Sequence, residues 1–456
     1  MRGKYELPRY LYECLKLSIK HRPYCRPKAL SRWYPVWVRS LQSSGTRLAD
    51  RRPCINFDAV ASLENLAGHR SRIFEYGCGG ATLFFADRVS ELVSIEHDPG
   101  WFKCVQEKMG GHPHACWTPH LVSPTSSVVP ATHLASDPDA YVSSEVRFSG
   151  FSFRDYAATI EAYQDNSFDL VLIDGRARPS CFKHALHKVK FGGAIVLNNA
   201  ERPQYAYIES VARALGFEIE EFWGPAPYER NFSRVLLMRK VQRYFALNDL
   251  DKKLEQHLDF DGGIFVEAGA NDGVKQSNTL HFETCRGWHG LLVEPVPELA
   301  RKCRIRRPRS IVEAVALVAP MEAGRPVTLR YADLMSVIKG GMKTAEEEQK
   351  HVEAGIKVQE LPNTFEIEVP SATLSGLFDK HGISQVHLLS LDLEGYERKA
   401  LEGLDFSRHR PQFILVEARY RDEIEQYLAP YYELKEELSH HDLLFQCREN
   451  LLAGTQ

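Results

Sequence analysis

One pattern occurs twice in this chain, once in each half: an apolar strand-like segment, a turn that contains glycines, and a second strand-like segment that ends on an acid. In the first half these are residues 72–75, residues 76–81 and residues 92–96. Strand, turn and helix in this order are typical of a doubly wound, mostly parallel sheet. Glycines let the backbone approach a ligand closely, and an acid after the second strand can accept hydrogen bonds from both ribose hydroxyls. The pattern therefore predicts a nucleotide-type pocket.

The second half repeats this order with residues 263–267, the turn at 269–273 and residues 290–294. Farther along, one apolar run ends on Asp392 and another, residues 413–417, also ends on an acid. In an open parallel sheet, ligands bind beyond the carboxyl ends of the strands. We therefore expect the acids and the glycine turn to share one pocket.

The length of 456 residues exceeds the size at which a single hydrophobic core keeps growing, so two domains are expected. The first half continues with a strand that ends on Asp174 and a further strand at residues 192–199, and a polar helix follows after Lys240. We therefore place one domain at residues 51–240 and a second at residues 241–456.

Residues 1–50 form a basic aromatic extension before the first domain. They contain eleven Lys and Arg against three Asp and Glu, together with Trp33, Tyr34 and Trp37. Such an arm could contact anionic lipid or nucleic acid. The alternative is a helical extension, with helix-like spacing at residues 11–19, that packs its aromatic side chains on the following domain.

The second half carries an insertion at about residues 332–364. It contains Gly340, Gly341 and a charged, helix-like run at residues 344–353. A long insertion of this kind near a pocket is a candidate lid. A solvated surface helix explains its composition equally well.

Composition excludes several classes of partner. The formal net charge of -3 gives no general argument for nucleic acid. No apolar run reaches the roughly 18 residues needed to span a bilayer, and the N-terminus lacks the apolar core of a signal peptide. The ten cysteines include no C-x-x-C pair, which suits a reducing compartment. We therefore expect a cytoplasmic protein with no membrane span and no nucleic-acid partner; a homodimer stays open.

The turns distinguish two cofactors that share this layout. A dinucleotide fingerprint requires a third glycine where Thr82 stands, and the second half has Gly-x-x-x-Gly instead. Glu75 and Glu267 lie two residues before the first glycine of each turn. A carboxylate there is poorly placed beside a pyrophosphate but well placed to hold the ammonium of a methionine moiety. The turns favour S-adenosylmethionine over a nicotinamide dinucleotide.

The first half, from Phe74-Glu-Tyr-Gly-Cys-Gly-Gly80 to Leu237, resembles a class I S-adenosylmethionine-dependent methyltransferase. Its segments Leu172-Ile-Asp-Gly-Arg176 and Val196-Leu-Asn-Asn199 are similar to motifs of catechol-type O-methyltransferases. In those enzymes, acids at the corresponding positions hold a divalent metal. Asn198 stands where the resemblance places an aspartate.

Residues 248–448 resemble the FkbM family of O-methyltransferases. The resemblance implies an O-methyltransferase that acts on a small molecule, a sugar or a glycosylated secondary metabolite. Together the two resemblances imply an α/β protein with two tandem Rossmann-like class I methyltransferase domains, each on a mostly parallel seven-stranded sheet. The four motifs that carry the FkbM resemblance are Val266–Gly273, Val293–Pro295, Asp392–Glu397 and Val416-Glu417.

The predicted site residues form a catalytic set and a cofactor set. Asp392 is the first candidate for a base or a metal ligand, and Glu394 and Glu417 could complete a site for a Mg²⁺-like ion, which prefers oxygen ligands. Asp174 is the catalytic candidate of the first half. Alternatively, Glu394 only caps a helix and Asp174 only fixes the next turn. The predicted cofactor-binding residues are Glu75, Gly77, Gly79 and Glu96 in the first half and Glu267, Gly269, Asn271, Asp272, Gly273 and Glu294 in the second.

Two functional classes remain open. The favoured one is a bifunctional O-methyltransferase with two S-adenosylmethionine sites. The other is a single active FkbM-like methyltransferase whose N-terminal domain serves as a scaffold for substrate binding or dimerisation, and Asn198 keeps this class open. Loops select the acceptor. The unlike loops of the halves, residues 119–137 and the segment around Gly340, therefore predict two different methylation positions.

Overall fold

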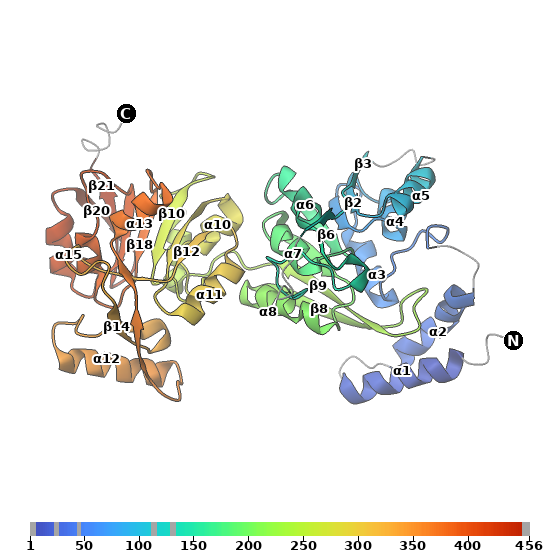
Figure 1. The fold of residues 1–456 in the computed structure, drawn as a ribbon, viewed down its shortest axis with the longest axis horizontal. Helices are drawn as coiled ribbons and strands as arrows, with labels where there is room; N and C mark the ends of the chain where they lie inside the picture. Colours follow the sequence, from blue (N-terminus) through green and yellow to red (C-terminus); the bar gives the residue numbers. More distant parts are fainter. Residues whose placement is uncertain (1–5, 22–26, 43–46, 111–115, 128–133, 449–456) are drawn as a thin grey trace. The chain divides into compact units, whose positions relative to one another are not determined.

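The computed structural model describes residues 6–21, 27–42, 47–110, 116–127 and 134–448 (Figure 1). The chain divides into two units, Met1–Gln242 and Arg243–Gln456, and each contains its own seven-stranded sheet. Parts of the basic extension and of the predicted loop 119–137 lie outside the described residues.

The sheet of the first unit has the strand order β3-β2-β1-β6-β7-β9-β8. The first five strands run parallel, and β9 is antiparallel to both β7 and β8. The strands are β1 (Arg72–Tyr76), β2 (Glu91–Glu96), β3 (Cys116–Leu121), β6 (Phe168–Ile173), β7 (Val189–Leu197), β8 (Phe217–Gly224) and β9 (Ser233–Lys240), with β4 (Thr125–Ser126) and β5 (Phe151–Ser152) forming a separate pair.

The central strands of this sheet are apolar on both faces because helices cover both, as in other parallel sheets. On one face, Ile73, Leu92 and Leu170 form a core with side chains from the helices that follow β1 and β2, such as Phe85 and Val105. The helices of this unit are α1 (Glu6–Lys20), α2 (Pro27–Gln42), α3 (Phe57–Leu66), α4 (Gly80–Ala86), α5 (Pro99–Met109), α6 (Arg154–Ala158), α7 (Arg178–Ala185) and α8 (Ala206–Ala214).

The sheet of the second unit has the order β12-β11-β10-β18-β19-β21-β20. Each strand takes the same place as its counterpart in the sheet of the first unit. Here too the first five strands are parallel and the last two form an antiparallel end. The strands are β10 (Ile264–Ala268), β11 (His289–Val293), β12 (Ile311–Glu313), β18 (Leu388–Leu391), β19 (Phe413–Glu417), β20 (Tyr432–Glu437) and β21 (Asp442–Cys447). Two layers of helices bury the two faces of this sheet.

On one face, Val266 and Leu389 pack with Leu377, Leu401 and Ile424 of three successive helices. The opposite face of the strands has its own core, which contains Phe265, Leu388 and side chains of the helices nearer the start of the unit. The helices of this unit are α9 (Leu250–Leu254), α10 (Leu280–Arg286), α11 (Pro297–Arg306), α12 (Ala345–Val358), α13 (Leu374–His381), α14 (Glu397–Glu402) and α15 (Arg421–Leu428).

The insertion of the second unit is folded. The strands β14 (Val327–Arg330) and β16 (Glu366–Val369) flank it and form an antiparallel sheet with β15 (Val337–Ile338), which lies within it. Helix α12 shares a hydrophobic cluster with β15. Thr344 caps α12 by accepting a hydrogen bond from the backbone of Glu347, and three acids occupy its first turn, where they suit the helix dipole. The apolar run 311–318 is divided: β12 joins the main sheet, and β13 (Ala316–Leu317) pairs with β17 (Ser371–Ala372).

The aromatic residues of the extension pack inward. Trp37 is fully buried, and its indole Nε1 donates a hydrogen bond to the carbonyl oxygen of Glu229 at 2.7 Å. Trp33 stacks on Phe57 at 5.0 Å between ring centroids, and Tyr34 packs against the same cluster. For the described residues, the aromatic side chains thus serve packing.

Candidate functional site

Three acids of the second unit meet at the ends of two neighbouring strands. Asp392 directly follows β18, Glu394 lies two residues farther, and Glu417 ends β19. One carboxylate oxygen from each lies within 4.8 Å of the other two. Glu394 has φ 54°, a left-handed conformation that costs a non-glycine residue of order 1 kcal/mol.

The crowding of these acids changes how they hold protons. The pKa of Asp392 is raised well above its ordinary value. The main cause is that surrounding protein atoms displace water from the carboxylate, and the negative charges of Glu417 and Glu394 add to it. The side chain still reaches solvent. Loss of solvent and the charge of Glu394 also raise the pKa of Glu417. Like charges this close favour either a shared proton or a bound cation.

Cationic and imidazole groups face the same acids. His351 Nε2 lies 3.1 Å from Glu394 Oε2, and Arg419 donates to His351 Nδ1 at 2.9 Å. His441 Nε2 lies 3.5 Å from Glu417. The sequence analysis missed all three. His351 belongs to α12, so only the folded chain shows that the insertion covers the acids.

Three cavities meet at these acids. The first contains Gly269 and Glu294 and is lined on its apolar side by residues around Leu317. The second is smaller and lies along the glycine turn. The third contains Glu417 and the cationic groups. Asp392 and Leu334 line all three cavities.

Glu294 is suited to accept hydrogen bonds inside the first cavity. It follows β11, and its two carboxylate oxygens accept hydrogen bonds from the backbone N–H groups of Asn271 and Val296, each at 2.8 Å. Burial raises its pKa to about 8. Each oxygen still has a lone pair for a ligand hydroxyl.

The glycine turn approaches β18 so closely that a side chain does not fit. Gly269 has φ 83°, and a Cβ there would lie 1.9 Å from the carbonyl oxygen of Asp392. Asn271 lines the first cavity, whereas Asp272 caps the backbone of Val274 and Lys275. Asp272 thus shapes the turn.

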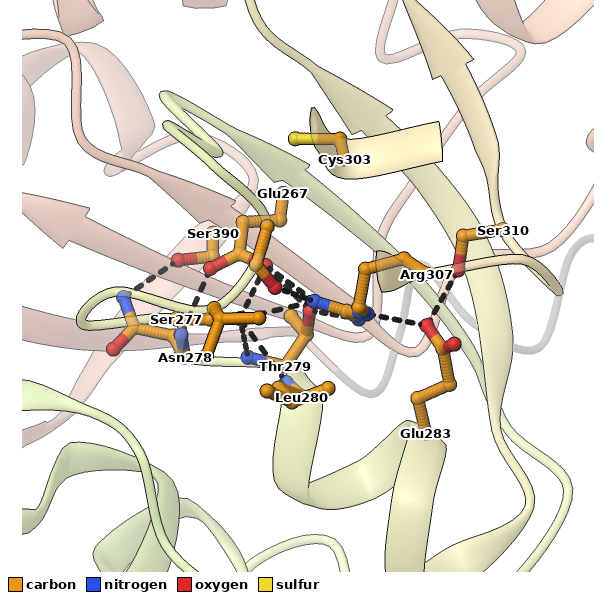
Figure 2. Close-up of polar contacts among 12 residues, drawn as sticks. Glu267, Ser277, Asn278, Thr279, Leu280, Glu283, Cys303, Arg307, Ser310 and Ser390 are labelled. Carbon is orange, nitrogen blue, oxygen red and sulfur yellow. Dashed lines mark hydrogen bonds and ion pairs between the residues drawn. The ribbon is translucent and has the colours of Figure 1, made fainter. Parts of the chain in front are cut away.

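Glu267 lies beside residues 277–279, which follow the glycine turn (Figure 2). One carboxylate oxygen accepts hydrogen bonds from the hydroxyls of Ser277 and Thr279 at 2.8 and 2.6 Å, and the other accepts from the backbone of Asn278 at 2.8 Å. Glu267 borders the second cavity, but its oxygens already accept hydrogen bonds from residues 277–279. Its position is that of a support.

A fully buried arginine completes this support. Arg307 donates to the carbonyl of Gly273 at 3.0 Å, to Ser277 at 3.1 Å and to Thr279 at 3.0 Å. Its Nε donates to Glu283 at 2.6 Å, and both side chains are buried (Figure 2). Several charge-assisted hydrogen bonds therefore fix the end of the turn.

The first unit has a larger cleft, about 390 Å³, at the corresponding place. Gly77, Gly79, Glu96 and Asp174 all line it. Gly77 has φ 94°, and a Cβ there would lie 3.0 Å from the backbone of Gly175. The cleft thus joins the glycine turn, the acid after β2 and the acid after β6.

Two predicted residues of this unit are already hydrogen-bonded. One oxygen of Glu96 accepts from the backbone of His97 and Asp98 at 2.7 and 2.9 Å. Glu75 is fully buried and does not line the cleft; it accepts hydrogen bonds from Ser94 at 2.6 Å and from Thr82. Burial raises the pKa of Glu75 to about 8.

Asp174 has an amide beside it instead of a second acid. Its Oδ1 accepts hydrogen bonds from Asn198 at 2.8 Å and from Arg178 at 3.2 Å. Within the described ranges, Asp392, Glu394 and Glu417 are the group of His, Cys, Asp or Glu side chains that could hold a metal ion.

The strand order, the glycine turns and the acid after each second strand define the fold as that of class I S-adenosylmethionine-dependent methyltransferases. Residues 267–448 match the family model of the methyltransferase FkbM domain. The second unit therefore contains an FkbM methyltransferase domain, and the protein is a methyltransferase. A search of curated proteins found no match.

Solved structures with similarity include a methyltransferase-like protein from Silicibacter pomeroyi, with 18% identity over 42% of this chain and 92% of that one (TM-score 0.28). An O-methyltransferase from Bacillus cereus in complex with SAH has 13% identity over 50% and 96% (TM-score 0.29). A methyltransferase from Geobacter sulfurreducens has 13% identity over 46% and 96% (TM-score 0.29).

Among the described helices, none combines the length and the apolar character needed to cross a membrane.

Proposed function

We propose that this protein is a bifunctional S-adenosylmethionine-dependent O-methyltransferase that acts on hydroxyls of a small molecule, a sugar or a glycosylated secondary metabolite. The observation that supports it is the position of Asp392, which lines the cavities beside the glycine turn and also the cavity that contains Glu417. A methyl donor held along the turn would present its methyl group at the acids.

In this proposal, the cofactor ribose binds Glu294 in the second unit and Glu96 in the first. The methionine part lies along the turns, at Gly269 and Asn271 in one unit and at Gly77 and Gly79 in the other. Glu75, Glu267, Asp272 and Gly273 contribute by holding these turns in shape. The two proposed catalytic domains are residues 51–240 and 241–456.

The proposed reaction is an in-line displacement. The acceptor oxygen forms a bond to the methyl carbon, the carbon–sulfur bond breaks, and the hydroxyl proton moves to a carboxylate. Asp392 is the proposed base in the second unit, because it borders both the cavities beside the glycine turn and the cavity that contains Glu417. Asp174 is the proposed base in the first unit.

The donor set of the second unit fits a divalent cation. Asp392, Glu394 and Glu417 provide oxygen ligands, and a cation would offset the repulsion that raises the pKa of two of them. A bound ion would supply charge stabilisation for the developing alkoxide. Asn198 in the first unit provides an amide instead, so we expect less metal dependence there.

The alternative is that only the second unit is active, while the first serves as a scaffold for substrate binding or for dimerisation. The amide of Asn198 favours this alternative. Its Nδ2 donates to Asp174 Oδ1 at 2.8 Å and to the carbonyl oxygen of Cys54 at 3.2 Å, which gives both side chains a structural role. The cleft with Glu96 favours a bound cofactor.

Calorimetric titration of the full-length protein with S-adenosylhomocysteine tests the proposal. We expect two sites per chain, one lost in Glu96→Ala and the other in Glu294→Ala. Loss of the carboxyl group that accepts hydrogen bonds from the ribose hydroxyls should weaken binding by roughly 1 to 3 kcal/mol in each variant. Glu298→Ala, an exposed change on α11, is the control. A wild-type stoichiometry of one favours the scaffold alternative, and no binding refutes both.

A further inference from the structure

Helix α1 has two faces of different character. Tyr10, Glu13 and Leu17 are buried, and they lie three or four residues apart on the face that contacts α2 and the first domain. The opposite face also carries apolar side chains, and among the described residues of the first unit these stay exposed.

The exposed face forms an apolar stripe. Leu7, Leu11, Leu15 and Ile19 recur every four residues, and Tyr12 lies beside them; the exposed fractions of these five side chains range from 46 to 74%. Fifteen helical residues span about 22 Å. Single exposed apolar residues are ordinary, whereas a continuous stripe of this length indicates a surface that another apolar phase covers.

The charged side chains that α1 exposes are all cationic. Arg9, Lys16 and Lys20 are exposed, whereas the two acids of the helix, Glu6 and Glu13, are buried. Glu13 pairs with Arg9 and Lys16, which holds both stems beside the stripe. An apolar stripe, a flanking row of cations and a tyrosine are the elements of a helix that lies in the interface of a membrane.

We propose that α1 binds the surface of an anionic membrane, with its axis in the membrane plane and the stripe from Leu7 to Ile19 among the acyl chains. This site is independent of the proposed catalytic function. Nucleic acid provides no apolar surface for the stripe. A second copy of this chain would place Arg9, Lys16 and Lys20 against the same cations, which is unfavourable. An anionic membrane offers acyl chains for the apolar stripe and negative headgroups for the cations.

Flotation of the full-length protein with vesicles tests this inference. We expect binding to vesicles of equimolar phosphatidylcholine and phosphatidylglycerol, weak binding to pure phosphatidylcholine, and a decrease with added salt. Leu11→Glu with Leu15→Glu should reduce binding more than about tenfold, because apolar burial is lost. Lys16→Ala and Lys20→Ala should each reduce it about fivefold.

Met321→Glu provides the matched control, because Met321 is 85% exposed and belongs to the second unit and not to α1. It should bind vesicles like the wild type, and all variants should keep the wild-type melting temperature and the same affinity for S-adenosylhomocysteine. Equal binding to neutral and anionic vesicles overturns the inference. So does a dimer, seen by sedimentation, that Leu11→Glu with Leu15→Glu dissociates while vesicles capture no protein.

Discussion

At the scale of single residues, Asp392 is the proposed base for the acceptor proton in the second unit. Asp392→Asn keeps the shape of the side chain but removes its basicity, so methylation by the second unit should fall by about 10² to 10⁴-fold. A chelator should also lower this activity, and added Mg²⁺ should restore it. Formation of S-adenosylhomocysteine with hydroxylated acceptors measures both effects. Activity that is insensitive to chelator and to the substitution would contradict the assignment.

A second residue makes stability depend on pH. The buried Glu75 has a pKa of about 8, against an ordinary value of 4.5. The folded chain thus keeps a proton that the unfolded chain releases, and stability falls as pH rises from about 4.5 to about 8. The slope is at most about 1.4 kcal/mol per pH unit.

Glu75→Gln keeps the hydrogen-bonding shape and removes the titration. Denaturant unfolding of wild type and variant between about pH 5 and about pH 8 should give a difference that shrinks or reverses as pH rises. Two parallel pH curves would show that Glu75 does not hold this proton.

At the scale of elements, the strands that could be predicted from the sequence are those buried on both faces of a sheet. Apolar residues predominate in the buried strands β1, β6 and β18, and the acids that follow β6 and β18, Asp174 and Asp392, marked the edge where the cavities lie. The edge strand β3 was not predicted, because it is half-exposed and contains Pro119 and His120. β20 was not predicted either, because it is mostly charged and exposed. Contacts such as His351 to Glu394 depend on the path of the insertion, which no local pattern encodes.

The turn that holds the second-unit cavities depends on a buried ion pair below it. Arg307→Met would leave the carboxylate of Glu283 buried without its partner, so we expect a loss of about 3 to 5 kcal/mol of stability together with weaker binding of S-adenosylhomocysteine. Adding Glu283→Gln should restore part of the stability. Arg301→Met breaks only an exposed pair and should leave the melting temperature unchanged. Equal melting temperatures for Arg307→Met and Arg301→Met would refute this role.

The insertion is tied to the same turn by Asn271, whose amide donates to Asp333 at 3.1 Å, and by Lys275, which follows the turn. Lys275 Nζ lies 2.9 Å from Asp333 and 2.8 Å from Gln359, at the two ends of the segment that includes α12. Lys275→Ala should loosen the insertion, so limited proteolysis within residues 332–364 should become several-fold faster. S-Adenosylhomocysteine should slow the cleavage in the wild type more than in the variant. Lys350→Ala, an exposed change on α12, serves as the control.

At the scale of the whole molecule, two sheets with one strand order carry different loops over their strand ends. Loops at this edge choose the acceptor. We therefore expect successive methylation at distinct hydroxyls of one product. Product from Glu96→Ala and from Glu294→Ala should each lack a different methyl group, as mapped by NMR. The same product from both variants, or no effect of Glu96→Ala, would favour the scaffold alternative.

Leu334 lines all three cavities of the second unit, and this has a consequence for binding. One side chain borders both the space proposed for the cofactor and the space proposed for the acceptor, so filling either space restricts how that side chain can move in the other. The two substrates therefore should not enter independently. The affinity for S-adenosylhomocysteine should change when the acceptor is bound, as calorimetry with and without the acceptor would measure, and equal affinities would contradict this coupling.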